Sequence, residues 1–379
     1  MNDNRKVALF GFIYLGLFGS FAVISPFLQL FLRGLDFSPS QIGLMLGSFE
    51  IAGIFGPMII GAAGDRTGKF KILLFTCEIL AIIFHSSLLL DLPFILSLGS
   101  IFFLGFFFKN GIPLTETLAS HGLPDFQKNY GKVRVVGSLS YVGVAFFLSV
   151  FKLIDATSPQ SILFWFVTMV LFHISTLFFL PKAEYTPEAH SKREGSLSLI
   201  FWLGIATVFF NRLSMSAYYS FFFLFIQETW NIQQIGAVSA LSAFAEIPVI
   251  IYAIRFIPRY GYPRLFTIAL LGTTARMMLN AFAPNFGLVL AGQVLHCLSF
   301  GLMHAVIIAF IQEKTKPANR GIAMAIYISL GMGMGGFLGS TMGGYIVEQS
   351  GFRMLYFIYG LIPLGGLIPC WFLKRRLAS

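Results

Sequence analysis

Charged side chains interrupt long apolar runs at seven places in this sequence. In the stretch IFFLGFFFKNGIPLTETLASH, residues 101–121, two of them fall among phenylalanines. A charge at the centre of a bilayer costs at least about 2.5–3.5 kcal/mol, so such charges usually line a water-filled path for a solute or an ion. The alternative is that buried ion pairs only hold helices together. The seven residues are Lys109, Arg212, Arg276, Glu50, Glu78, Glu116 and Glu246.

The composition predicts a membrane protein. Of 379 residues, 56% are hydrophobic and 11% are charged, whereas a soluble domain carries about 25% charged residues. The first apolar run, from Val7 to about Leu32, is too long for a cleaved signal peptide, so we expect it to remain as a helix. Cys77, Cys297 and Cys370 lie within apolar runs, which predicts free thiols and no disulfide framework.

Twelve apolar runs are long enough to cross about 30 Å of hydrocarbon. The polar stretch PKAEYTPEAHSKREGSLS at 181–198 divides them into two sets of six. The predicted fold is an all-α membrane protein with twelve transmembrane helices in two six-helix bundles, residues 1–180 and 199–379, joined by a cytoplasmic linker. The runs lie at 7–32, 40–62, 70–90, 93–120, 130–153, 160–180, 199–226, 233–257, 263–283, 286–312, 319–346 and 351–373.

The basic residues predict the orientation of the chain. Twenty of the 26 Lys and Arg fall at the N-terminus, in the links after even-numbered runs and at the C-terminus, whereas Arg33, Lys152 and Arg353 fall on the opposite side. By the positive-inside rule, both termini and the linker are cytoplasmic in a multi-pass protein of the cytoplasmic (inner) membrane. This asymmetry explains the net charge of +10 without a nucleic-acid partner.

Two short patterns recur at one spacing. SQIG at 40–43 returns as QQIG at 233–236, and RTGKFK at 66–71 returns as RYGYPR at 259–264, so both copies lie 193 residues apart. Two loops on one offset indicate an internal duplication. In duplicated transporters the substrate lies between the repeats near the membrane midplane, and we expect it there.

The loop GAAGDRTGKFK at 61–71 combines glycines, which allow a tight turn and close helix approach, with charges that can form a lock on the cytoplasmic surface. It resembles the loop signature between helices 2 and 3 of the major facilitator superfamily, although the second copy lacks the aspartate. The resemblance implies that superfamily's fold and transport by alternating access. The signature residues are Gly61, Asp65, Arg66, Gly68 and Lys69.

Three further stretches are similar to the phenylpropionate-permease branch of this superfamily and, more distantly, to lactose permease. They are YGKVRVVGSLSY at 130–141, PLTE at 113–116 and LHCLSFGLMH at 295–304. The resemblance to lactose permease implies that Glu116 and Arg134 bind the substrate. It places Tyr141 where that permease has a sugar-stacking tryptophan.

The same resemblance implies that Glu246, Arg276 and His296 couple transport to protons. Each lies about 13–17 Å from the start of its run at 1.5 Å per residue, so the three share a depth and contact is expected. Movement of Arg276 would switch Glu246 between holding and donating a proton, and His296 would share that proton. The alternative is a static buried triad that stabilises the C-terminal bundle.

The sequence departs from lactose permease at two places. Ser299 stands where the permease has its proton-carrying glutamate. Asn211 and Arg212 stand in the region where it has two acids on helix 7. A sugar substrate and the same proton path therefore do not follow from the resemblance.

Other polar residues are weaker candidates. Lys109 lies almost two turns before Glu116 on the same face, and it either binds substrate or neutralises Glu116. Arg212 and Tyr218 are predicted to line the cavity and bind substrate, and His304 is a candidate proton relay. Three residues are as easily explained by a structural role as by a functional one, namely Glu50, Glu78 and His85. His173 is expected to be a hydrogen-bonded packing residue.

These features predict a secondary active transporter for a small polar or anionic solute, working by proton symport. An aromatic or other carboxylic acid and a sugar or nucleoside both fit. Proton-coupled efflux and a non-transport receptor or scaffold are the alternatives. No His-Glu-x-x-His or Gly-x-Ser-x-Gly motif supports an enzyme. The expected partners are the solute, protons and the bilayer, with no cofactor, metal or nucleic acid, and the chain is expected to be a monomer.

The orientation can be tested in the linker. Ser191→Cys should react with a membrane-impermeant maleimide only after cells are opened, because the linker is predicted to be cytoplasmic. A cysteine at Lys152, on the opposite side, is the control and should react in intact cells. Labelling of residue 191 from outside intact cells would overturn the topology.

Overall fold

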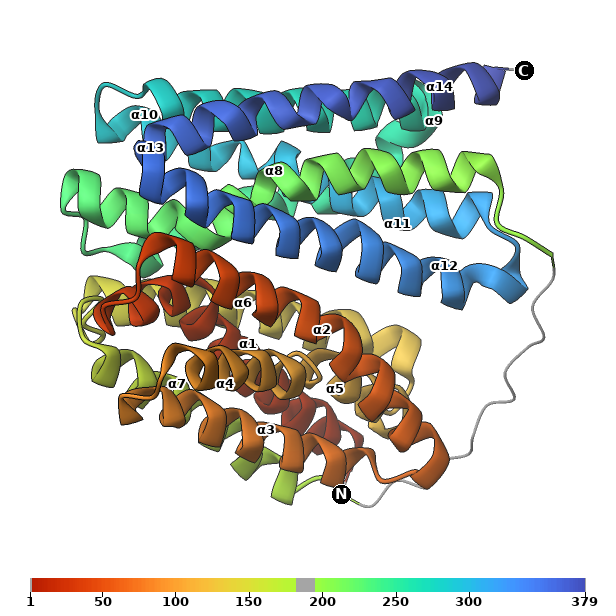
Figure 1. Ribbon diagram of the computed structural model, residues 1–379. Coiled ribbons are helices and arrows are strands. Elements are labelled where there is room, and N and C mark those ends of the chain that lie inside the picture. The colour runs from red at the N-terminus through yellow and green to blue at the C-terminus, as the bar shows by residue number, and fades with distance from the viewer. Residues whose placement is uncertain (1, 182–194, 379) are drawn as a thin grey trace. The chain divides into compact units, whose positions relative to one another are not determined.

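The computed structural model describes residues 2–181 and 195–378, which form helices and short connections (Figure 1). Among these residues, ten helical segments are long and apolar enough to cross a membrane. Two of the ten contain a break, at Gly261 with φ 71° and at Gly351 with φ 77°, where the chain turns. A positive φ is accessible to glycine at little cost. Counting both sides of each break gives the twelve predicted segments.

The described residues fall into two compact units. The first takes residues from Met1–Phe37, Ser48–Ala189 and Gln233–Ala240, and the second from Ser38–Gly47, His190–Ile232 and Leu241–Ser379. Most of the predicted linker, residues 182–194, lies outside the described residues. The boundary predicted at 181–198 therefore stays a prediction.

The first unit contains seven helices among its described residues, one of them shared at its start with the second unit. They are α1 (Asp3–Gly34), α2 (Pro39–Thr67), α3 (Phe70–Ser87), α4 (Phe94–Phe108), α5 (Gly111–Gly122), α6 (Phe126–Val150) and α7 (Pro159–Phe178). A short 3₁₀ turn, Leu88–Leu90, follows α3.

The second unit combines α-helices with two stretches of π-helix. The α-helices are α8 (Leu199–Trp230), α9 (Ile235–Phe282), α10 (Phe286–Val294), α11 (Met303–Lys314), α12 (Arg320–Ile326), α13 (Gly335–Gly365) and α14 (Leu367–Ala378). The π-helical segments are Cys297–Leu302, between α10 and α11, and Tyr327–Met334, between α12 and α13. A 3₁₀ turn, Pro317–Asn319, precedes α12.

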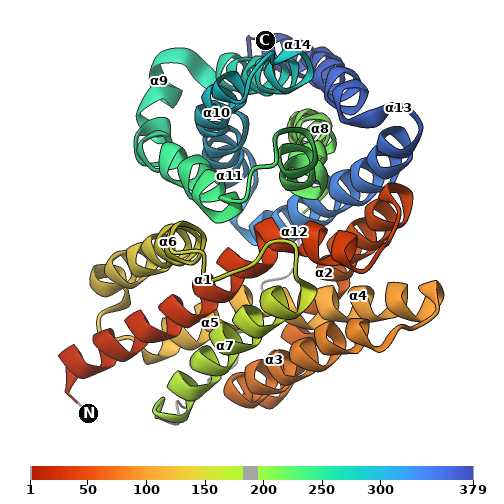
Figure 2. The ribbon, with the colours of Figure 1, turned by 90° about the vertical axis from the view of Figure 1, so that its left-hand side faces the viewer.

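One helix lies at the centre of each unit. In the first, α1 packs against α6 and α7, and its Phe10, Tyr14 and Leu17 belong to the buried core. In the second, α8 packs against α11, α13 and α14, and Figure 2 shows it surrounded by the other helices of its unit. Most residues of both helices are buried, as expected for helices at the centre of their units.

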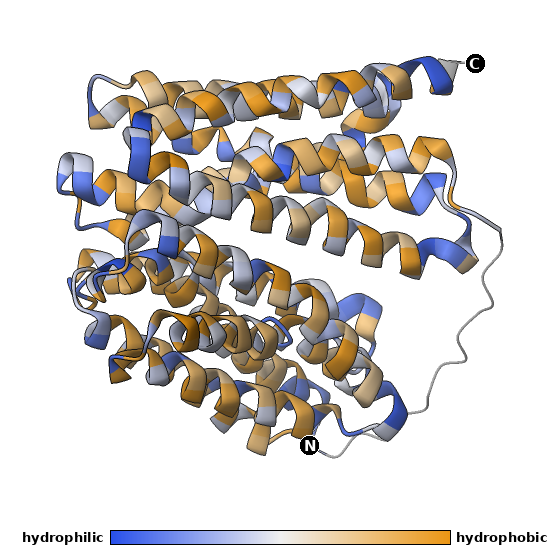
Figure 3. Cartoon of the chain, viewed as in Figure 1, coloured by the Kyte–Doolittle hydropathy of each residue, from blue (hydrophilic) through white to orange (hydrophobic). Residues whose placement is uncertain are grey.

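Polar residues mark the helix ends. The side chain of Ser198 accepts a hydrogen bond from the backbone N–H of Phe201 at the start of α8, and Asn285 does the same for Leu288 at the start of α10. Such caps satisfy backbone donors that a helix start leaves open. Figure 3 shows the resulting pattern, with hydrophilic residues gathered near helix ends and hydrophobic ones along the helices.

The fourth predicted run is one span, Phe94–Gly122, that is interrupted at Lys109 and Asn110 between α4 and α5. Pro113 has no backbone N–H for the carbonyl of Lys109, and its ring crowds that carbonyl. The helix breaks there, and the side-chain amide of Asn110 donates to the carbonyls of Phe106 and Phe107, which ends α4. Lys109 consequently sits at a helix end.

Gly16 tests the packing of the central helix α1. A Cβ at this position would lie 2.7 Å from the backbone of His173 on α7. Gly16→Ala should therefore destabilise the protein by about 1–3 kcal/mol through overpacking. Thermal unfolding in detergent is the measurement. Gly11→Ala on the same helix is the matched control, since its nearest neighbour lies at 4.0 Å. Equal stability of the two variants would contradict the packing described for α1.

Candidate functional site

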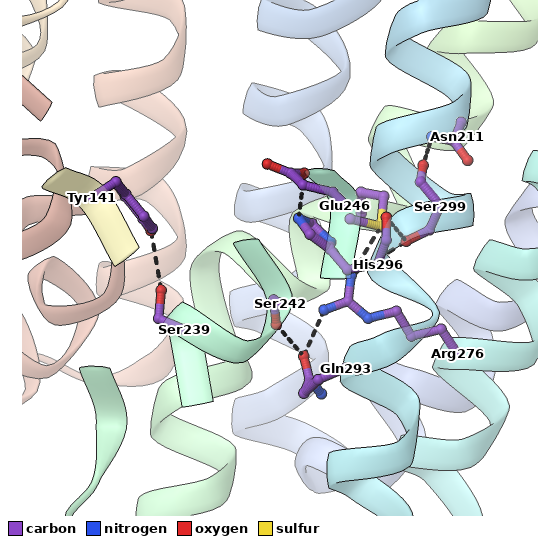
Figure 4. A network of polar contacts seen from close by, with 10 residues as sticks. Tyr141, Asn211, Ser239, Ser242, Glu246, Arg276, Gln293, His296 and Ser299 are labelled. Atoms are coloured by element: carbon purple, nitrogen blue, oxygen red, sulfur yellow. Dashed lines mark hydrogen bonds and ion pairs between the residues drawn. The ribbon is translucent and has the colours of Figure 1, made fainter. Parts of the chain in front are cut away.

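Arg276, on the second half of α9, organises a polar cluster in the second unit. Its side chain has no exposed surface. One guanidinium nitrogen lies 2.7 Å from Nδ1 of His296 and the other 2.6 Å from Oε1 of Gln293 (Figure 4). The guanidinium also stands 4.0 Å from the ring centre of Tyr218. We call these four residues and Glu246 the Arg276 cluster.

The contact with Arg276 determines which nitrogen of His296 carries the proton. A guanidinium can only donate, so Nδ1 must accept and is unprotonated. The imidazole is then neutral and carries its hydrogen on Nε2. That nitrogen faces Oε2 of Glu246 at 3.6 Å (Figure 4). His296 thus lies between Arg276 and Glu246, with one ring nitrogen facing each of them.

The three residues predicted to share a depth are in contact, and Gln293 joins them. Gln293 accepts a hydrogen bond from Arg276 and another, at 3.2 Å, from the hydroxyl of Ser242. The sequence contained a signal for Gln293, because it is a polar residue one helical turn before His296 and lies on the same face. Gln293 was not predicted as a site residue.

The helix that carries His296 changes form at this residue. The π-helical segment Cys297–Leu302 begins immediately after it. Within the segment, the Ser299 carbonyl accepts a hydrogen bond from Asn211 of α8 at 2.9 Å, and Asn211 in turn accepts one from Thr273 at 2.7 Å. Arg276 reaches the Ser299 hydroxyl at 3.4 Å. π-Helical turns are frequent at functional sites.

Arg212 makes the matching contact to the second π-helical segment. Its Nε donates to the carbonyl of Met332 at 3.3 Å, and its guanidinium stands 4.3 Å from the ring centre of Tyr219. The cavity beside Arg212 and Tyr219 has a volume of only about 20 Å³, which is too small for an organic solute. In this conformation Arg212, predicted to bind substrate, is a helix-to-helix contact.

His304 lies one step beyond the Arg276 cluster. Its Nδ1 is 2.8 Å from the hydroxyl of Tyr327. The ring of Phe300 stacks between His296 and His304, with ring-centre distances of 5.5 and 5.3 Å. The predicted relay is thus separated from His296 by an apolar ring in this conformation.

In the first unit, Glu116 of α5 and Arg134 of α6 lie side by side. Oε1 of Glu116 is 3.9 Å from Nε of Arg134, and both side chains are about a third exposed. The guanidinium stands 4.5 Å from the ring centre of Phe18, and its Nη1 is buried without a hydrogen-bond partner. The phenols of Tyr14 and Tyr130 lie within electrostatic reach of Glu116. Nothing in the sequence distinguished these two tyrosines from packing residues.

Lys109 pairs with Glu50. Its Nζ is 3.0 Å from Oε2 of Glu50, and it stands 4.6 Å from the ring centre of Phe49. Lys109 was expected either to bind substrate or to neutralise Glu116. The ion pair that the structure shows is with Glu50 instead, and substrate binding by Lys109 stays a prediction.

The hydroxyl of Tyr141 on α6 lies 3.0 Å from the hydroxyl of Ser239 at the start of α9, a segment that groups with the first unit (Figure 4).

Glu78 of α3 contacts Nδ1 of His173 on α7, and both are buried. His173 is therefore hydrogen-bonded, as expected. His85 is fully buried between the rings of Phe31 and Phe166.

The loop signature forms the turn between α2 and α3. Asp65 and Arg66 lie in the last turn of α2, and Gly68 follows with φ 67°. The expectation of close helix approach at Gly61 is wrong for this conformation, because no atom would lie within 4 Å of a Cβ there. The close approach occurs one turn later, at Gly64, against the ring of Phe70.

Two units of apolar helices with charged residues among them are typical of major facilitator transporters. Residues 7–358 match the MFS_1 like family, so the chain belongs to this family. It is a multi-pass membrane protein and a transporter of small molecules, not an enzyme.

Relatives match over nearly the whole chain. The probable 3-phenylpropionic acid transporter of Escherichia coli (strain K12) is 22% identical and covers 99% of this chain and 98% of its own length. The maltose permease of Geobacillus stearothermophilus is 25% identical, over 98% of this chain and 95% of that protein. The crystal structure of the nucleoside transporter NupG has the same fold, with a TM-score of 0.79 at 18% identity, covering 99% of both chains.

The Lys109–Glu50 pair can be tested by removing one or both charges. Glu50→Gln should destabilise the protein by up to about 3 kcal/mol, because it leaves a largely buried ammonium without its counter-charge. The double variant Glu50→Gln/Lys109→Gln should recover much of that loss. Thermal unfolding of the purified variants measures both. If the double variant is less stable than each single variant, the two residues do not act as a pair.

Proposed function

We propose that this transporter takes up a small organic acid together with a proton. The observation that supports the acid is the state of Arg134, whose Nη1 is buried without a partner while its Nε side faces Glu116. A guanidinium with an open donor fits a carboxylate. Phe18, Tyr14 and Tyr130 beside it fit an aromatic or other apolar body.

The relatives are consistent with this proposal and leave room for others. One is named for 3-phenylpropionic acid, another for maltose, and the structural neighbour for nucleosides. The chain supplies carboxylates as well as arginines, so a sugar or nucleoside that accepts and donates hydrogen bonds also fits. We place the protein in the inner membrane as a monomer with both termini cytoplasmic, as the basic residues predict.

Coupling runs through the Arg276 cluster in this proposal. Arg276 holds Nδ1 of His296 and thereby points the Nε2 hydrogen at Glu246. If Arg276 moves away during the transport cycle, His296 becomes free to accept a second proton, and Glu246 loses a nearby positive charge. Both changes alter the proton affinity of His296 and Glu246. The competing explanation is a static cluster that only stabilises the second unit.

Substitution of Arg134 tests the proposed substrate binding. Arg134→Ala should lower the uptake of labelled 3-phenylpropionate, the probe suggested by a relative, by at least about tenfold, since a charge-assisted hydrogen bond contributes about 1.5–3 kcal/mol. Arg134→Lys should recover only part of it, because an ammonium lacks the planar fork of donors. Lys132→Gln, an exposed neighbour on α6, is the matched control.

The uptake of labelled maltose and of labelled uridine is measured in parallel with that of the acid in proteoliposomes. Uptake of either, with none of the acid, would overturn the organic-acid proposal. Undiminished affinity of the transported solute in Arg134→Ala would overturn the assignment of this residue.

Substitution of Glu246 tests the proposed coupling of transport to protons. Glu246→Gln should lose accumulation driven by a proton gradient while keeping exchange of solute, because exchange requires no net proton release. Glu313→Gln is the control, as Glu313 is more than half exposed at the end of α11. Uphill transport at the normal rate would exclude Glu246 as the proton carrier, and a variant that fails to fold would favour the static cluster. Accumulation driven outward by the gradient would show efflux instead of symport.

A further inference from the structure

A second kind of pocket lies beside the loop signature, which contributes Gly68 and Lys69 to its wall. In the first unit, the start of α3, the end of α5 and the end of α7 enclose a pocket of about 520 Å³. Its wall is mostly apolar, with Phe75, Leu177 and Phe178 among the lining residues, and Lys69 and Lys71 stand at its edge. Lys71 also donates to the carbonyl of Leu180 at 2.8 Å, which ties α3 to the end of α7.

The second unit has a pocket of similar size and composition. It measures about 560 Å³ and lies between the second half of α9 and α14. Ile268, Cys370 and Trp371 contribute to its wall, and Arg264 and Lys374 supply positive charge. Here Cys370 donates to the carbonyl of Pro263 at 3.1 Å, so the two helices are tied together as in the first unit.

The two pockets occupy the same place in the internal repeat. Their lining residues pair at the offset of 193 that relates the duplicated loops. Both members of each pair line their pocket, and the pairs are Phe70 with Pro263, Lys71 with Arg264, Phe75 with Ile268, Leu177 with Cys370, and Phe178 with Trp371. Three of these five positions differ in residue type by more than a conservative exchange, but the basic position and the large aromatic position are kept in kind.

The lining chemistry is that of a membrane interface. Phe178 is 69% exposed and Trp371 is 47% exposed, and aromatic residues gather where lipid headgroups meet hydrocarbon. Among the described residues that line either pocket, none is acidic. Both pockets lie at helix ends that the positive-inside rule assigns to the cytoplasmic side. Basic pockets between transmembrane helices on that side suit anionic lipid headgroups.

We propose that these pockets are a pair of binding sites for anionic phospholipid, one in each unit. The basic residues bind the phosphate of the headgroup, and the aromatic and aliphatic wall contacts an acyl chain. A soluble anion would use the charges but would leave the exposed apolar wall unused. This proposal is independent of the solute that the protein transports.

The test uses tryptophan quenching by brominated lipids. The first reporter keeps Trp371 and replaces Trp165, Trp202 and Trp230 with phenylalanine. The second reporter also has Trp371→Phe and carries Phe178→Trp. Each full-length protein is reconstituted in phosphatidylcholine that contains a small, equal fraction of brominated phosphatidylglycerol or brominated phosphatidylcholine.

Brominated phosphatidylglycerol should quench both reporters more strongly than brominated phosphatidylcholine. Near a membrane surface each basic residue favours anionic lipid by about fivefold. Arg264→Gln/Lys374→Gln should therefore remove the difference for Trp371 only, and Lys69→Gln/Lys71→Gln should remove it for Phe178→Trp only. Lys128→Gln, an exposed basic residue that lines neither pocket, is the control and should change neither.

Three results would overturn the proposal. Equal quenching by the two lipids would show that the sites do not select charge. A preference that survives the glutamine variants would show that other residues attract the lipid. A preference seen with one reporter alone would show that the pockets are not a pair. If Lys71→Gln disturbs folding through its contact with Leu180, Lys69→Gln alone should still weaken the preference in the first unit.

Discussion

The burial of the Arg276 charge is the constraint around which the second unit is organised. Moving an ion of this size out of water costs several kcal/mol unless other groups replace its hydration. Gln293, His296 and the face of Tyr218 supply that replacement, and none of them carries a negative charge in the arrangement seen here. The carboxylate of the cluster, on Glu246, lies on the far side of the imidazole, 3.6 Å from its Nε2. A change at any member therefore alters the balance of charge at the others.

The central helix α8 links this constraint to the shape of its neighbours. Asn211 and Arg212 are adjacent in sequence, and each donates to a carbonyl of a different π-helical segment. A π-helical turn widens the backbone, and its carbonyls need partners in a membrane interior that offers no water. By supplying those partners from one helix, the protein holds two deformed helices in place next to the Arg276 cluster. One of the deformed segments begins directly after His296.

Much of this arrangement could be predicted from the sequence, because its determinants are local. The apolar runs predicted the helices, and shared depth predicted the contact of Glu246, Arg276 and His296. Residues whose role depends on the path of a neighbouring helix were not predicted. The pairing of Lys109 with Glu50 depends on the helix break near Pro113. Tyr14 becomes a candidate site residue only because α1 passes Glu116. The π-helical segments likewise have no sequence signature that the periodicity of apolar residues reveals.

The functional consequence is that the two units contribute different chemistry. In the first, an arginine with an open donor stands among aromatic rings, and in the second a buried arginine controls a histidine and a glutamate. The first arrangement suits the recognition of a solute, and the second suits the handling of a proton. Their roles in transport are proposals, but both follow from the same physical rule, that a charge in a low-dielectric interior persists only with partners.

The protonation of His296 is the measurement that tests this account most directly. Nitrogen NMR of ¹⁵N-histidine-labelled protein in nanodiscs, with His296→Asn to assign the signal, reports which ring nitrogens carry hydrogen. The account predicts a neutral ring with an unprotonated, hydrogen-bonded Nδ1 and a hydrogen on Nε2. An imidazolium, or a neutral ring with its hydrogen on Nδ1, would contradict it, because neither could accept a hydrogen bond from Arg276.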